Sequence, residues 1–130
     1  MHKIVILSSS VRLGRKSNRV AGFFVNYIKE NNIAAVELVD LDAYNFPIFE
    51  ERLKFLQDPP ANLQEYATKI READGVLIVS PEYNGGYPAS IKNAIDVLVE
   101  EWKRKPVAIA TVSAGPFGGN NMISSLQYCL

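Results

Sequence analysis

Three short runs of apolar residues stand out along the chain: Ile4–Leu7, Val76–Val79 and Val107–Val112. They are rich in Val and Ile and do not alternate with polar residues, which is typical of strands buried on both faces of a parallel sheet. A fourth segment, Val36–Leu41, mixes apolar residues with Glu37 and Asp40 and indicates a half-covered strand at a sheet edge. We therefore predict four strands, of which the three apolar runs, including 107–112, are buried on both faces.

Between these runs, apolar residues recur at the three- and four-residue spacing of a helix face. The spacing predicts helices over Val20–Ile28, Leu63–Ile70, Ile91–Trp102 and Met122–Leu126. Ser17 or Asn18 is expected to cap the first of them, and Pro106 to follow the end of the third. Strands and helices thus alternate along the chain, which predicts an α/β fold with a doubly wound parallel sheet.

Composition limits the classes of protein to which the chain can belong. Its 130 residues are enough for a single domain, 1–130, and 14 basic against 14 acidic residues give no net charge, which argues against a nucleic-acid binder. One cysteine, Cys129, and one histidine, His2, exclude an internal disulfide and the usual zinc sites. We find no apolar stretch long enough to span a membrane and no signal segment, and we expect a cytoplasmic protein.

The first of three unusual loops, residues 8–18, joins the first strand to the first helix. It combines four serines with Arg12, Arg15 and Lys16 at a helix N-terminus, a set of donors that suits a phosphate group. The spacing matches neither a Walker A loop nor a dinucleotide-binding glycine motif. A serine-capped helix with solvated basic residues is the alternative.

The other two loops follow the third and fourth strands. Residues 80–88 combine two prolines, an Asn-Gly-Gly turn and two tyrosines, and residues 113–121 contain three glycines that allow close backbone approach. In open α/β sheets, ligands bind beyond the carboxyl ends of the strands. The three loops together therefore predict a site with one anionic and one planar subsite, although each alone is compatible with an ordinary turn.

These loops resemble those of the NADPH-dependent FMN reductase family, which has a flavodoxin-like fold and includes quinone, azo-dye and chromate reductases. The resemblance is most specific in Ser80–Pro88 running into Ile91–Asp96. It extends through Ser10-Val11-Arg12, Ser17-Asn18 and Asp40-Leu41 to the 113–119 loop, and it covers nearly the whole chain.

The resemblance implies cofactor contacts at particular positions. The FMN phosphate is expected at Ser10, Arg12, Ser17 and Asn18. The ribityl chain and the isoalloxazine are expected along Pro81, Glu82, Tyr83 and Asn84. The pyrimidine end of the ring is expected at Ser113, Gly115 and Gly119. No catalytic side chain and no metal site are expected, because the flavin carries the chemistry.

The function implied is an NAD(P)H oxidoreductase with FMN and NADPH, or NADH, as cofactors. It would pass electrons in ping-pong fashion to a small-molecule acceptor, such as a quinone, an azo compound, a flavin or a metal oxyanion. The resemblance also implies a homodimer or homotetramer. A flavodoxin-like electron carrier without turnover of its own is the alternative, although such carriers tend to be acidic.

Two features depart from the family pattern. Ser9 stands where the family commonly has glycine. The flavodoxin-like strand order 2-1-3-4-5 also requires a fifth strand followed by a helix. The sequence shows no pattern for either element. We therefore expect either a C-terminally truncated form, with the strand at 107–112 left as an edge, or a second chain that covers this edge.

Overall fold

The computed structural model describes residues 1–130. Its strands are β1 (Lys3–Ser8), β2 (Ala35–Asp40), β3 (Gly75–Pro81) and β4 (Val107–Val112). Its α-helices are α1 (Ser17–Glu30), α2 (Leu41–Tyr44), α3 (Ala61–Glu72), α4 (Ala89–Asp96) and α5 (Asn120–Gln127), and two single-turn 3-10 helices are η1 (Leu53–Phe55) and η2 (Glu100–Trp102). None of the helices combines the length and the apolar character that a membrane span requires.

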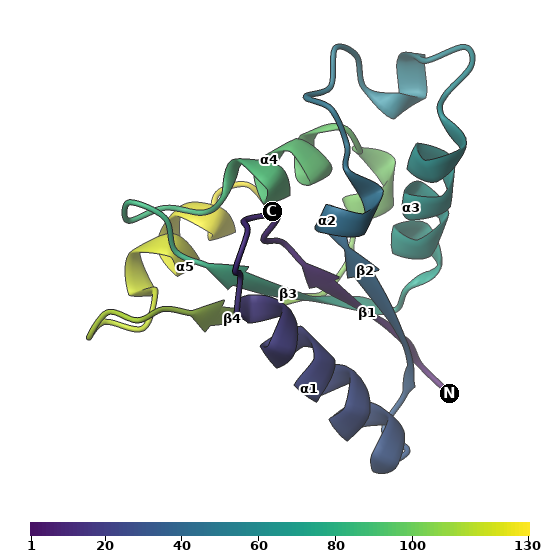
Figure 1. The fold of residues 1–130 in the computed structure, drawn as a ribbon. Helices are drawn as coiled ribbons and strands as arrows, with labels where there is room; N and C mark the ends of the chain where they lie inside the picture. Colours follow the sequence, from purple (N-terminus) through teal and green to yellow (C-terminus); the bar gives the residue numbers. More distant parts are fainter.

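The four strands form one parallel sheet in the order β2-β1-β3-β4 (Figure 1). This confirms the flavodoxin-like order that we predicted for the strands present. Helix α1 covers one face, where Ala21 packs on Ile6 and Val79, while α3, α4 and α5 cover the other face. Because all strands point the same way, their carboxyl ends lie along one edge of the sheet.

The third predicted helix is shorter than its apolar periodicity indicated. Helix α4 ends at Asp96, and the chain turns before η2 instead of continuing as one helix to Trp102. The Val97 carbonyl accepts the Leu53 N–H at 2.9 Å, and the Ile95 carbonyl accepts the Trp102 indole N–H at 3.2 Å. Tertiary partners thus engage carbonyls that a longer helix would pair internally.

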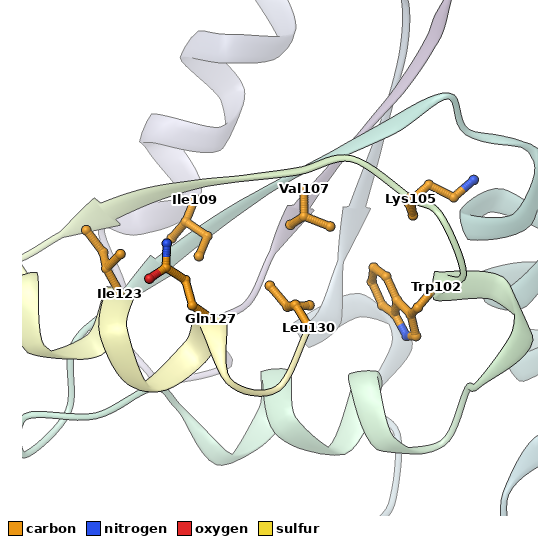
Figure 2. A pocket seen from close by; sticks show the side chains of 7 residues that line it. All are labelled: Trp102, Lys105, Val107, Ile109, Ile123, Gln127 and Leu130. Carbon is orange, nitrogen blue, oxygen red and sulfur yellow. The ribbon is translucent and has the colours of Figure 1, made fainter.

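Strand β4 is an edge strand and is only partly covered, so the prediction of burial on both faces is wrong. Val107 and Ile109 face α5, where they line a groove of ≈ 320 Å³ with Ile123 and Leu130 (Figure 2). On the α1 side, Ala108 is exposed and the rest of the strand is half-buried. α1 packs against β1, β2 and β3 and leaves this side of β4 largely uncovered.

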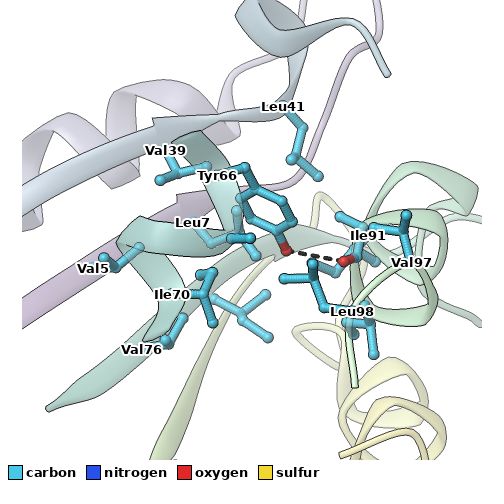
Figure 3. Packing of buried hydrophobic residues seen from close by; sticks show 14 of the residues in the cluster. Val5, Leu7, Val39, Leu41, Tyr66, Ile70, Val76, Ile91, Val97 and Leu98 are labelled. Carbon is cyan, nitrogen blue, oxygen red and sulfur yellow. Dashed lines mark hydrogen bonds between the residues drawn. The ribbon is translucent and has the colours of Figure 1, made fainter. Parts of the chain in front are cut away.

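The larger part of the core lies between the sheet and helices α3 and α4 (Figure 3). Tyr66 is its largest fully buried side chain, and it packs among aliphatic residues such as Leu7 and Ile91. Its hydroxyl donates to the Ala94 carbonyl at 3.0 Å, which ties α3 to α4. Burial raises the pKa of Tyr66, so the phenol stays neutral and remains a donor.

We expect Tyr66→Phe to lower the free energy of unfolding by about 1–2 kcal/mol, because the buried Ala94 carbonyl loses its side-chain partner while the packing volume hardly changes. Urea denaturation of the purified protein measures this. Tyr128→Phe is the matched control, since Tyr128 is 93% exposed. Equal losses in the two variants would contradict a structural role for the Tyr66 hydroxyl.

Candidate functional site

The loops after β1, β3 and β4 enclose a cleft of ≈ 460 Å³ at the carboxyl edge of the sheet. The structure brings together most of the residues predicted for the site. Those that line the cleft are Ser10, Arg12, Ser17, Pro81, Glu82, Tyr83 and Ser113. Arg15 and Lys16, which the sequence placed among the donors of the first loop, line it as well, and so do Val112 and Ala114, which it had not singled out.

The start of α1 is the most polar part of the cleft, and it is not capped as predicted. Lys16 occupies the N-cap position, and no side chain accepts from the first backbone N–H groups of the helix. The Ser17 hydroxyl is buried without a hydrogen-bond partner, and so are the Ser8 hydroxyl and Asn18 Oδ1. Buried polar groups are nearly always paired in folded proteins. The Ser17 hydroxyl, a donor that lines the cleft beside a positive helix end, therefore fits a bound anion.

Of the three cationic side chains that line the cleft, one is paired with a carboxylate and two are not. Arg15 donates to both carboxylate oxygens of Asp40, at 2.5 and 2.8 Å, and to the Ser10 carbonyl at 2.8 Å. Arg12 and Lys16 are exposed and have no carboxylate partner. Arg15 thus fixes the loop on the end of β2, and Arg12 and Lys16 supply the unbalanced positive charge.

Ser10 and Tyr83 connect the first and second loops across the cleft. Ser10 Oγ and the Tyr83 hydroxyl lie 2.7 Å apart and form a hydrogen bond. Ser9, next in the chain, is held to β3 because both its N–H and its hydroxyl donate to the Val79 carbonyl at 3.1 Å. The serine that replaces the family's usual glycine is therefore accommodated by a buried hydrogen bond.

Four of the predicted site residues do not line the cleft: Asn18, Asn84, Gly115 and Gly119. Asn84, with φ of 52°, and Gly85 form the centre of a tight turn that two backbone bonds between Tyr83 and Gly86 close. Gly115 is exposed, and its N–H donates to Ser113 Oγ at 3.0 Å. These residues shape the loops, and their contact with a cofactor stays a prediction.

Gly119 is required for a reason that the sequence did not reveal. Its φ is +81°, and a Cβ added there would lie 2.8 Å from Thr111 Cβ. Thr111 also donates its hydroxyl to the neighbouring Gly118 carbonyl. A side chain at position 119 would collide with β4 itself, whether or not a ligand is present.

The sequence matches a known protein family over nearly its whole length. The model of the NADPH-dependent FMN reductase family matches residues 2–129. An NAD(P)H-dependent FMN reductase of Schizosaccharomyces pombe is 35% identical over 130 residues, which cover 97% of this chain and 64% of that protein. A quinone reductase of Escherichia coli K12 is 34% identical over 122 residues, 90% of this chain and 63% of the relative. The chain therefore spans slightly less than two thirds of each of these relatives.

A solved structure shares the fold at lower sequence identity. FerB of Paracoccus denitrificans, a flavoenzyme NAD(P)H:(acceptor) oxidoreductase, superposes with a TM-score of 0.80 at 24% identity. The match covers 98% of this chain and 70% of FerB. It supports the strand order and the placement of the helices described above.

We expect Asp40→Asn to destabilise the protein near neutral pH and to have a smaller effect in acid. The hydrogen bonds from Arg15, opposed by partial burial, lower the pKa of Asp40. A lowered folded-state pKa contributes stability that is present above the unfolded value, about 4, and is lost as the pH falls through the folded value. The difference in unfolding free energy between wild type and variant should therefore shrink as the pH is lowered from neutral through about 4 and below.

Urea denaturation over this pH range measures the difference, with Asp58→Asn as the control. Asp58 is exposed and has no ionic or hydrogen-bonding partner. A difference that stays constant with pH, or that Asp58→Asn reproduces, would show that the Arg15 pair does not anchor the loop.

Proposed function

Because the chain belongs to the NADPH-dependent FMN reductase family, whose model matches residues 2–129, we propose that it is an FMN-dependent NAD(P)H oxidoreductase. The relatives named above are themselves called FMN reductase and quinone reductase. The cleft between the three loops is the FMN site in this proposal, and the phosphate lies at the start of α1.

The unpartnered Ser17 hydroxyl is the observation on which the proposal rests. It is 2% exposed, it lies on the first residue of α1, and it lines a cleft that also holds the free charges of Arg12 and Lys16. A phosphate at this point accepts from the serine hydroxyl and from the free N–H groups of the helix, and it balances the two cations. No other described cavity combines these features.

The remaining walls suit the uncharged part of FMN. Pro81 and Tyr83 on one side, with Val112 and Ala114 on the other, provide apolar surface next to hydroxyl groups. We propose that the ribityl chain and ring lie along Pro81, Glu82, Tyr83 and Asn84, with the pyrimidine end toward Ser113, Gly115 and Gly119. Ser10 and Tyr83 hold the two walls together at the phosphate end.

FMN supplies the redox chemistry when bound: it accepts a hydride from NADPH or NADH and then passes electrons to a small-molecule acceptor. The chain's own residues bind and orient the cofactor, and the proposal assigns no proton transfer to a side chain. We propose quinones, azo compounds, flavins or metal oxyanions as acceptors. We further propose that the protein works in the cytoplasm as a homodimer or homotetramer, as its family resemblance implies.

An absorption spectrum of the protein after reconstitution with FMN and removal of free cofactor tests binding. Oxidation of NADPH, with and without a quinone, then separates an enzyme from an electron carrier. We expect flavin absorption bands and acceptor-dependent turnover. Bound flavin without NAD(P)H oxidation would favour the carrier, and no bound flavin would refute the proposal.

We predict that Arg12→Ala weakens FMN binding about tenfold to hundredfold, because a hydrogen bond to a charged group contributes roughly 1.5–3 kcal/mol. Lys16→Ala should have a smaller effect, since an ammonium group cannot hold two phosphate oxygens in a planar, bidentate arrangement. Titration of FMN fluorescence gives both dissociation constants. Equal affinity for wild type and Arg12→Ala would remove Arg12 from the phosphate site.

A further inference from the structure

Helix α5 follows the 113–119 loop, whose Ser113 and Ala114 line the cleft, and side-chain hydrogen bonds hold the helix to the rest of the protein at only two points beyond its own connection to β4. The Met122 N–H donates to Glu82 Oε2 at 3.1 Å, and the Cys129 thiol donates to the Tyr87 hydroxyl at 3.4 Å. Both partners belong to the loop between β3 and α4, which runs beside α5 (Figure 1). The loop between β3 and α4 therefore contacts the helix near its beginning and the chain just beyond its end.

By accepting from the Met122 N–H, Glu82 acts as the cap of helix α5. The residue before α5 is Gly119, which has no side chain to offer, and the first turn contains no acidic residue. Met122 is the third residue of the helix, and an N-cap side chain usually accepts from the N–H at this position or the one before it. Glu82 supplies this acceptor from a different loop, and its negative charge lies at the positive end of the helix.

Glu82 has no cationic side chain as a partner, although several lie around the cleft. Arg15 is engaged by Asp40, and Glu82 lines the same cleft as Ser113. The α5 N-terminus is thus the group that compensates this carboxylate. Sequence resemblance assigned Glu82 to the cofactor, and that contact stays a prediction; in the structure Oε2 of its carboxylate accepts from the Met122 N–H.

We infer that Glu82 is a positioning residue that sets the separation of the 82–88 and 113–119 loops, and that its charge tunes the redox potential of the flavin between them. This inference rests on the proposed FMN site. A side chain that fixes two walls changes cofactor affinity through the position of those walls, because the walls must otherwise be ordered during binding. A nearby negative charge also disfavours the reduced, more negative flavin.

Two substitutions separate the hydrogen bond from the charge. Glu82→Gln keeps an oxygen that can accept from the Met122 N–H, whereas Glu82→Ala removes it. Glu30→Gln and Glu30→Ala are the matched controls, since Glu30 is an exposed residue at the end of α1 without a partner. Circular dichroism and urea denaturation are used to check that all four variants fold.

The first measurement uses the protein without FMN. Hydrogen exchange at the α5 amides should be roughly fivefold faster in Glu82→Ala, the effect of losing a typical helix cap, and nearly unchanged in Glu82→Gln. Unchanged exchange in Glu82→Ala would show that the bond does not hold the helix, and would overturn the inference independently of any cofactor.

The second measurement uses the FMN-loaded protein. We expect FMN to bind about fivefold or more weakly to Glu82→Ala and with nearly wild-type affinity to Glu82→Gln. The midpoint potential of bound FMN should be more positive in Glu82→Gln, which a purely structural role would not predict. Unchanged affinity in Glu82→Ala, or an unchanged potential in Glu82→Gln, would overturn the inference and leave the proposed function intact. Failure of the wild type to bind FMN would instead overturn the proposed function, and the role in cofactor positioning with it.

Discussion

In the register that pairs β1 with β3, Ser8 lies beside Val79, and both strands run toward the same edge of the sheet. The pairing continues past the end of β1, because Ser9 donates twice to the Val79 carbonyl. The first loop therefore leaves the sheet from a fixed point next to the second loop. The Ser10 bond to Tyr83, the anchoring of Arg15 and the exposure of the α1 N-terminus all depend on this common origin.

Much of the fold could be predicted from the sequence because it depends on local patterns. The Val- and Ile-rich runs mark β1, β3 and β4, and the helical spacing marks α1 and α3. The end of α4 could not be predicted, since it depends on Leu53, which is far away in the sequence and takes the Val97 carbonyl. Burial of β4 was overestimated for a related reason: apolar composition indicates that a strand can be covered, and only the arrangement of its neighbours decides whether it is.

The candidate site was predictable as a set of loops but not as a set of contacts. Serines and basic residues near a helix start pointed to the α1 N-terminus, which lines the cleft. Composition could not show which basic residue would be neutralised, and the pairing of Arg15 with Asp40 follows from the position of the β2 end beside the first loop. The Asp40-Leu41 segment had been noted as the end of a predicted edge strand and as part of the resemblance, without an ionic partner. An acidic residue that ends the strand adjacent to β1 is the signal that could have identified Arg15 as a structural cation.

The close contact between Gly119 and Thr111 makes β4 and its loop a single structural unit. The glycine conformation begins α5, and the threonine side chain occupies the volume that any larger residue at position 119 would need. For protein engineering, this means that the loop cannot be exchanged by itself. A loop transplanted from a relative has to be moved together with the strand residue at position 111, since the two surfaces are shaped against each other.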